Sequence, residues 1–347
     1  STDSVVSGVI SEENDKLALT SGTKIVTYDL RTCEKVKTEK RLHLDVISGI
    51  LWAPNNTKIT VSFDCYVKLS SENSVIADTK LPNWLNTLDL VDNKLWVGDL
   101  NGSITLLDYP SLSISEKLDG CHLVQNITSS VNSISHSAKG IVASTGADGN
   151  FLLWDPKTLS VIRREIATHS GSKMNGIIFH PSKDAFVSSG RDSSLLVWDL
   201  RMDKPIKRLR SESHVNNVFR TNMAWESNDI IITGSENGKL IAYSLTQGKP
   251  IAETTVSQTP VHSVFIAKSE SKRIYSQSIR SMETSIFELG LPYQDEVLCN
   301  EMENDIELSG NEDRLIGMLQ RQGMSLSAFD LLQNLIASNA DNVGIEE

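Results

Sequence analysis

The chain has 347 residues, of which 39% are hydrophobic and 22% charged, and its formal net charge is −11. Its longest apolar runs, such as Phe151–Trp154 and Ile230–Ile232, are far shorter than the roughly 18 residues that a membrane-spanning helix needs. The opening residues, STDSVVSGVISEEND, lack the basic and apolar regions of a secretory signal. We therefore expect a protein of the cytoplasm or nucleus that is neither secreted nor inserted into a membrane.

The spacing of the cysteines and the distribution of charge narrow the class of protein further. The four cysteines contain no closely spaced pair, which argues against a disulfide framework and against a zinc site. Residues 289–347 hold twelve acidic and two basic residues, so this segment carries −10 and the 288 residues before it carry −1. The sequence therefore predicts a nearly neutral body followed by an acidic tail.

One pattern recurs through the body. Thr145–Ile166 (TGADGNFLLWDPKTLSVIRREI) and Ser189–Leu209 (SGRDSSLLVWDLRMDKPIKRL) share small residues, an Asp, an apolar strand that ends in Trp-Asp, a turn and another strand. Seven strand ends of this kind follow one another at spacings of 38 to 47 residues: Tyr28-Asp29, Leu69-Ser70, Leu107-Asp108, Trp154-Asp155, Trp198-Asp199, Tyr243-Ser244 and Phe287-Glu288. Such a period indicates one repeat architecture.

Each repeat predicts four short strands in the same order. First strands include residues 4–11, 48–54, 175–181 and 221–227, and second strands include residues 94–99, 140–146, 185–190 and 230–235. Turn residues such as Asp148-Gly149 and Asn237-Gly238 lead into the third strand, and the fourth strand is more polar. Four antiparallel strands in about 44 residues are the pattern of a propeller blade.

We therefore expect an all-β, seven-bladed propeller over residues 1–302, followed by a short C-terminal helical extension. A strand at Glu296–Met302 would complete the last blade, because the first repeat already has an inner strand of its own.

The strand ends and the period resemble those of the WD-repeat (WD40) family. In that family a His, a Ser or Thr, an Asp and the strand-end Trp form a buried, hydrogen-bonded structural set. The resemblance implies a full set in the fifth repeat and a set without its His in the fourth: His169, Ser188, Asp192 and Trp198, and Ser144, Asp148 and Trp154. The sixth repeat offers Asn237, Tyr243 and His214 at these positions, and repeats one, two, three and seven lack most of the set.

The sequence carries none of the common local signatures of catalysis. It has no GxxxxGK[ST] loop, no GxSxG elbow, no HExxH and no GxGxxG. Its seven histidines do not pair at metal-ligand spacings, and Cys121-His122 alone cannot close a four-ligand zinc site. We therefore expect no enzymatic activity, no cofactor and no metal.

Four residues of the body are candidates for binding partner proteins. Trp84 falls in the loop before the first strand of the third repeat, where it either anchors a partner or packs beneath the loop. Arg201 ends WDLR, which resembles the W-D-x-R signature of WD-repeat substrate receptors in cullin-type ubiquitin ligases. Arg191 and Glu236 stand next to predicted turns between second and third strands.

Basic residues gather on the predicted outer strands of the fourth and fifth repeats: Arg163, Arg164, Arg201, Lys204, Lys207, Arg208 and Arg210. They could bind an acidic ligand, but Lys and Arg also protect edge strands from pairing with other chains. The stretch lacks the interleaved aromatic residues of proteins that bind single-stranded nucleic acid. We favour edge protection and expect no direct nucleic-acid ligand.

Residues 303–347 predict an acidic linker and two short amphipathic helices. Phe329, Leu332, Leu335 and Ile336 share one helical face, which either docks on the propeller or binds a partner. The acidic stretch could attract a basic client protein.

These features predict a non-catalytic scaffold or adaptor subunit that binds several proteins in one assembly. Three alternatives stay open: a substrate receptor of a cullin-type ubiquitin ligase, an escort for a basic client such as a histone or ribosomal protein, and an obligate partner of a modifying enzyme such as a protein arginine methyltransferase.

Overall fold

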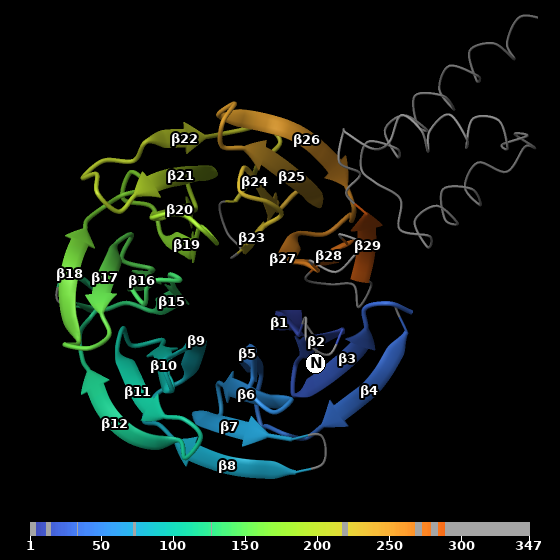
Figure 1. Ribbon diagram of the computed structural model, residues 1–347, viewed down its shortest axis with the longest axis vertical. Coiled ribbons are helices and arrows are strands. Elements are labelled where there is room, and N and C mark those ends of the chain that lie inside the picture. Colours follow the sequence, from blue (N-terminus) through green and yellow to red (C-terminus); the bar gives the residue numbers. More distant parts are fainter. Residues whose placement is uncertain are drawn as a thin grey trace, which may run out of the picture.

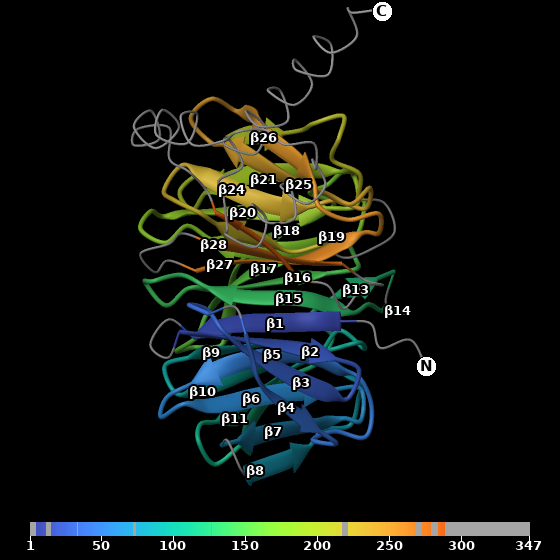
Figure 2. The same ribbon diagram turned by 90° about the vertical axis from the view of Figure 1, so that its right-hand side faces the viewer.

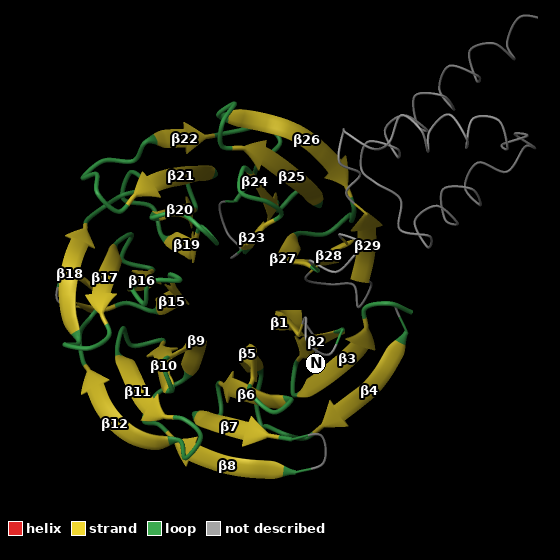
Figure 3. Ribbon diagram, viewed as in Figure 1, coloured by secondary structure: helices red, strands yellow, loops and turns green. Residues whose placement is uncertain are grey.

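The computed structural model describes residues 5–11, 15–32, 34–71, 74–125, 127–216, 221–267, 273–278 and 284–288. This part of the chain contains strands and no helix, and Figure 3 shows the strands joined by loops and turns. No helix among these residues is long and apolar enough to cross a membrane.

Six sheets have four strands each, and in every one the strands follow one another as an antiparallel meander. The first sheet holds β1 Val5–Ser11, β2 Lys16–Ser21, β3 Lys24–Asp29 and β4 Lys35–Lys40; the second, β5 Ile47–Ala53, β6 Thr57–Ser62, β7 Tyr66–Ser70 and β8 Val75–Lys80; the third, β9 Leu85–Val91, β10 Lys94–Asp99, β11 Ile104–Asp108 and β12 Ser113–Leu118. The fourth holds β15 Val131–His136, β16 Val142–Gly146, β17 Phe151–Asp155 and β18 Ser160–Glu165; the fifth, β19 Met174–Phe179, β20 Ala185–Gly190, β21 Ser194–Asp199 and β22 Lys207–Leu209; the sixth, β23 Met223–Trp225, β24 Ile230–Gly234, β25 Lys239–Ser244 and β26 Lys249–Thr255.

Two smaller sheets complete the described residues. A three-stranded sheet contains β27 Val261–Ile266, β28 Arg273–Ser278 and β29 Thr284–Glu288. A hairpin of β13 Leu123–Val124 and β14 Ile127–Thr128 interrupts the connection between the third and fourth sheets.

The sheets stand radially around a central axis as a propeller (Figure 1). The first strand of each sheet lies next to the axis and the fourth lies at the rim. The three-stranded sheet stands between the sixth and the first, and β1 packs against both β5 and β27. Seen from the side, the ring is a thick disc (Figure 2).

The predicted all-β propeller is therefore confirmed, with six four-stranded blades among the described residues. The predicted inner strand of the first repeat is also confirmed, since β1 pairs with β2. Seven blades were expected. The strand that would give the three-stranded sheet its fourth member, predicted at Glu296–Met302, lies outside the described residues, as do residues 303–347.

Neighbouring sheets share their apolar cores. Between the fourth and fifth sheets, Phe151 packs edge-on against Phe186 and Trp198, with ring centroids 5.3 and 5.0 Å apart. A comparable cluster joins every other pair of neighbours, including the three-stranded sheet with the sixth and with the first. One sheet cannot cover its own two faces, so the repeats bury one another.

Polar side chains on the inner strands also tie neighbouring sheets together. Ser48 donates to the carbonyl of Leu85 (2.6 Å), Asn86 to that of Val131 (2.7 Å) and Asn132 to that of Met174 (2.6 Å). Each donor lies at an irregular step in the pairing of its strand, where a β-bulge turns an extra side chain away from the regular register. The bulges thus supply links from one sheet to the next.

The meander gives the ring two distinct faces. The upper face carries the loops that lead from the fourth strand of one sheet to the first strand of the next, together with the hairpins between second and third strands. The lower face carries the turns between first and second strands and between third and fourth strands. These two names are kept below.

Candidate functional site

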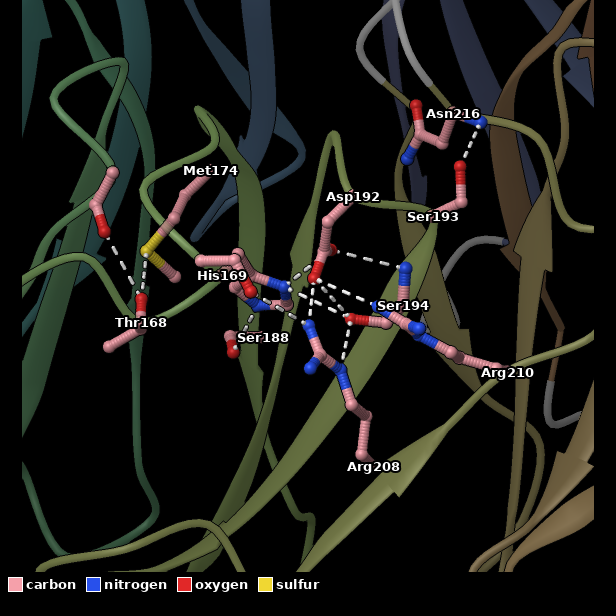
Figure 4. Close-up of polar contacts among 12 residues, drawn as sticks. Thr168, His169, Met174, Ser188, Asp192, Ser193, Ser194, Arg208, Arg210 and Asn216 are labelled. Atoms are coloured by element: carbon pink, nitrogen blue, oxygen red, sulfur yellow. Dashed lines mark hydrogen bonds and ion pairs between the residues drawn. The ribbon is translucent and has the colours of Figure 1, made fainter.

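A chain of four buried polar side chains crosses the fifth sheet near the upper face. Trp198 donates from Nε1 to Ser188 Oγ (3.0 Å), and Ser188 Oγ lies 3.0 Å from His169 Nε2. The other ring nitrogen, His169 Nδ1, lies 2.8 Å from Asp192 Oδ1 (Figure 4). A neutral imidazole with its proton on Nδ1 satisfies every partner, because a hydroxyl can accept from Trp198 and donate to His169.

Two arginines extend this set to the surface. Arg208 in β22 hydrogen-bonds and ion-pairs with the Asp192 carboxylate, and Arg210 lies 3.8 Å from it. Figure 4 shows both arginines converging on Asp192. Burial alone would raise the pKa of Asp192, but hydrogen bonds from His169, Ser194 and Arg208 hold it well below its ordinary value. Asp192 is therefore ionised and fully partnered.

Ser188, His169 and Asp192 are the residue types of a hydrolase triad, so their accessibility decides what they can do. In a triad the Ser hydroxyl must reach the substrate carbonyl. Here Ser188 and His169 have no exposed surface, and the Ser188 hydroxyl is already held by Trp198. This Ser cannot act as a nucleophile in this fold, and the four side chains act as mutually satisfied polar groups within the blade.

The fourth sheet has a complete set of the same kind, and the expectation that it lacks a His is wrong. His122 lies 3.0 Å from Asp148 through Nδ1 and 2.9 Å from Ser144 Oγ through Nε2. Trp154 donates from Nε1 to the same Ser144 oxygen (3.0 Å). The β13–β14 hairpin lies between His122 and β15, the first strand of the fourth sheet. This insertion adds residues between the His and that strand, so the His is not at the position expected from the other repeats.

The second sheet also has most of the set, contrary to the expectation for that repeat. His43 lies 3.0 Å from Asp64 through Nδ1 and 2.8 Å from Thr60 Oγ1 through Nε2. Leu69 stands at the strand end in place of the Trp. Burial lowers the pKa of His43 in spite of its aspartate partner, so a neutral ring is favoured.

The sixth sheet keeps a reduced version. Tyr243 Oη lies 3.2 Å from His214 Nδ1, while Asn237 donates to the carbonyl of Ser213 (2.8 Å) instead of reaching the ring. Burial lowers the pKa of His214 to about 4, so this histidine is neutral at neutral pH.

A spacing in the sequence would have found the missed sets. Thr60 and Asp64, Ser144 and Asp148, and Ser188 and Asp192 are all four residues apart, on either side of the turn into the third strand. A His precedes the Ser or Thr of each pair by 17 to 22 residues. The strand-end Trp is therefore a weaker marker of the set than the Ser/Thr-Asp spacing.

Trp84 lies on the upper face, immediately before β9, and is 60% exposed. Its ring centroid is 6.2 Å from that of Phe63, in the hairpin between β6 and β7. The Trp84 carbonyl accepts from the backbone N–H of Leu100 (2.9 Å), which fixes the base of the side chain. Of the two alternatives, the structure favours an exposed Trp84 over one packed beneath its loop.

The other candidates in the body lie apart from Trp84. Arg191 is half-buried on the upper face of the fifth sheet, and Glu236 is half-buried on that of the sixth. Arg201 is on the lower face, with its side chain 79% exposed but turned back onto Asp199 (Nη2 to Oδ2, 2.5 Å). This pairing lowers the pKa of Asp199 to about 2. Phe329, Leu332, Leu335 and Ile336 lie outside the described residues.

Several outer-strand cations contact the propeller itself. The Arg163 guanidinium lies over the rings of Phe151 and Trp198, at 5.8 and 5.6 Å from their centroids. Arg164 donates to the carbonyl of Cys121 (3.4 Å), and Lys207 donates to carbonyls of the sixth sheet. These contacts bind sheets together, which is a structural use of the basic stretch.

The described residues contain no group of three or more His, Cys, Asp or Glu side chains that could hold a metal ion. Cys65 and Cys121 are free thiols, and burial raises the pKa of Cys121 to about 12, so that thiol is protonated and unreactive.

Comparison with known proteins gives one family. The family model described as WD domain, G-beta repeat matches residues 160–199, which run from β18 of the fourth sheet to the end of β21 in the fifth. No curated protein matches the chain. The matched segment contains the His169, Ser188, Asp192 and Trp198 set; the fourth sheet has a second complete set, and the second and sixth sheets have partial ones. The match and the propeller arrangement are together consistent with a WD-repeat propeller family.

Proposed function

We propose that this chain is a non-catalytic scaffold or adaptor that holds partner proteins on the faces of its propeller. WD-repeat propellers serve generally in protein–protein interaction. The observation that carries the proposal is an apolar cluster on the upper face, formed by the exposed Leu44 and Trp84 and the half-buried Phe63 and called the upper patch below.

The upper patch is held in place by its own loops. Leu44 is 89% exposed, yet its backbone N–H donates to the buried Asp64 carboxylate (2.9 Å). Phe63 donates from its backbone to the carbonyl of Val46 (3.0 Å), and Leu81 donates to that of Cys65 (2.8 Å). Large apolar side chains fixed in an exposed position lose little entropy when a partner covers them, and exposed aromatics are favoured anchors in interfaces.

We further propose that the three-stranded sheet is the seventh blade of the scaffold. Its support is the shared apolar cores on both sides: Val261 and Val264 pack with the sixth sheet, and Ala267 packs with Leu17 and Leu19 of the first. A closed ring leaves no sheet with an uncovered face, which gives a rigid platform for several partners.

The experiment is affinity purification with the full chain as bait and quantitative identification of the retained proteins. We expect Leu44→Asp with Trp84→Ser to lose at least one partner that the unchanged chain retains. The matched control is Ile76→Ser, which removes a 55% exposed apolar side chain from β8, the outer strand of the second sheet. Loss of the same partners in the control, or no loss in the double variant, would remove the upper patch from the proposal.

A further inference from the structure

Four consecutive sheets carry the same backbone link at the upper end of their first strands. The residue immediately before the first strand accepts, through its carbonyl, from the backbone N–H of the residue immediately after the second strand. Because the first strands lie next to the central axis, each link holds a pair of side chains around the upper end of that axis (Figure 1). In the second to fifth sheets these pairs are Val46 and Phe63 (3.0 Å), Trp84 and Leu100 (2.9 Å), Ser130 and Ala147 (2.9 Å), and Lys173 and Arg191 (2.9 Å).

These four pairs, called the upper ring below, change in character from one end to the other. The pairs of the second and third sheets are apolar and include Phe63 and Trp84 of the upper patch. The pair of the fourth sheet has only small side chains, and the pair of the fifth sheet is wholly basic. A partner that covers the upper ring therefore meets an apolar surface at one end and two positive charges at the other.

The two cations of the upper ring have no side-chain partner within the described part of the chain. Neither the Lys173 ammonium nor the Arg191 guanidinium makes a hydrogen bond or an ion pair there. Arg191 is half-buried, and its Nε is shielded from solvent without a hydrogen-bond partner, while Lys173 is exposed beside it. A shielded donor without a partner costs free energy, and an acceptor brought by a ligand recovers that cost.

The other charges at the upper end of the fifth sheet leave a positive surplus. They comprise two arginines and two carboxylates: Arg208, Arg210, Asp192 and Glu212. Asp192 follows Arg191 directly, but its side chain is only 8% exposed and is held by a histidine and by both of these arginines. With Lys173 and Arg191 the cations outnumber the carboxylates, so this end of the upper ring is positively charged at neutral pH.

The carboxylates of the neighbouring sheets do not pair with the two cations. Asp148 of the fourth sheet has no exposed side-chain surface and is held by the histidine of its own set. Glu236 follows β24 at the corresponding place in the sixth sheet, and neither Lys173 nor Arg191 forms an ion pair with it. Asp45 is exposed, but it precedes the apolar pair of the second sheet, at the other end of the upper ring. A negatively charged group is therefore attracted at the fifth sheet and repelled at the second.

We propose that the upper ring binds a continuous segment of a partner protein that combines a large apolar residue with Asp or Glu. The apolar residue covers the upper patch, the segment crosses the small pair of the fourth sheet, and the carboxylate binds Lys173 and Arg191. A carboxylate forms charge-assisted hydrogen bonds with these donors, which are stronger than neutral ones and fix the direction of the bound segment. This inference rests on the proposed function, because it names the chemistry of a partner that the upper patch holds.

The test is selection of twelve-residue peptides from a random displayed library on the immobilised full chain, followed by fluorescence anisotropy with synthetic copies. We expect the retained peptides to combine Asp or Glu with Trp, Phe or Leu. Lys173→Gln with Arg191→Gln should weaken their Kd by about tenfold or more, because hydrogen bonds to charged groups are lost. The matched control is Lys157→Gln with Lys204→Gln, which removes the same charge from exposed turns of the lower face and should change the Kd by less than about twofold.

A charge exchange separates direct contact from loss of structure. Arg191→Glu should abolish binding of an acidic peptide, and the same peptide with Lys in place of its acidic residue should bind this variant more tightly than it binds the unchanged chain. The proposal is overturned if no retained peptide depends on Lys173 and Arg191, or if the dependent peptides lack Asp and Glu. Displacement of the peptides by a lower concentration of a twelve-nucleotide single strand would also overturn it, in favour of a nucleic-acid ligand. The scaffold function has its own test, since loss of partner proteins in Leu44→Asp with Trp84→Ser does not depend on these peptides.

Discussion

Ser144 and Ser188 each lie between a Trp and a His, and this position explains how the interior tolerates so many polar atoms. Each hydroxyl accepts one hydrogen bond and can donate another, so it links a donor-only indole to an imidazole. A buried polar group costs free energy only when it lacks a partner. The sets thus fix the orientation of the Trp side chains on which the sheet-to-sheet cores depend.

Trp198→Ala should lower the free energy of unfolding by about 3 kcal/mol or more. The change leaves a cavity beside Phe151 and Phe186, removes the hydrogen bond to Ser188 and takes away a ring that Arg163 covers. Urea denaturation of the variant and the unchanged chain measures the effect. The control is Trp84→Ala, which removes an exposed indole and should change stability by less than about 0.5 kcal/mol.

His214 predicts a loss of stability in mild acid. Its pKa is about 4 in the fold because burial disfavours the charged ring, whereas an unfolded His titrates near 6.5. Above pH 6.5 both states are neutral; as the pH falls from 6.5 toward 4, the unfolded chain takes up the proton first. The folded state therefore loses up to about 3 kcal/mol from this group over that interval.

The measurement compares the unchanged chain with His214→Gln at several pH values between 7 and 4. The stability advantage of the unchanged chain should shrink as the pH falls, because Gln does not titrate. All other titrating groups are common to both proteins and cancel in the difference. A difference that is independent of pH would show that His214 is protonated equally in the folded and unfolded states.

At the scale of elements, the strands could be predicted and the insertions could not. The seven predicted strand ends occupy the last two positions of β3, β7, β11, β17, β21, β25 and β29, since an apolar run followed by turn residues marks a strand end locally. The sequence of the β13–β14 hairpin lacks this pattern, so the hairpin was not predicted. His122, which precedes the hairpin, was therefore not assigned to the fourth sheet. The bulges of the inner strands were missed as well, because an extra residue there is defined by the partner strand.

The same limit applies to the sites. Trp84 could be singled out because an aromatic residue in a loop is visible in the sequence. A pocket on the lower face that Lys139, Lys183 and Lys207 help to line could not, since these residues come from three separate turns and strands. Only the stacking of sheets brings such residues together.

Asn132→Ala tests the links between inner strands. Asn132 is buried and donates to the carbonyl of Met174 in the next sheet (2.6 Å), so its loss leaves a buried carbonyl without that partner. We expect a loss of about 1–3 kcal/mol in the free energy of unfolding. Asn101→Ala removes an exposed Asn from a turn of the third sheet and should cost less than about 0.5 kcal/mol. Equal effects would mean that the inner-strand link contributes nothing beyond the turn.

At the scale of the whole molecule, the ring makes each sheet depend on two neighbours. Linear repeat proteins have end repeats that open first, because an end repeat has only one neighbour. Here β1 packs against β27 as well as β5, and a shared core lies between every neighbouring pair of sheets, so the described ring has no free end. Local opening of one sheet would uncover two apolar faces at once.

The ring should therefore unfold as one cooperative unit. Ile59→Ala in the second sheet and Phe186→Ala in the fifth remove fully buried side chains from separate cores. Each should destabilise by about 2–5 kcal/mol, and differential scanning calorimetry should show a single transition that both variants shift to lower temperature. In a linear array, each change would instead lower a transition of its own and leave the rest of the chain melting as before. Two separate transitions in either variant would show that the contact between β1 and β27 does not couple the ends of the ring.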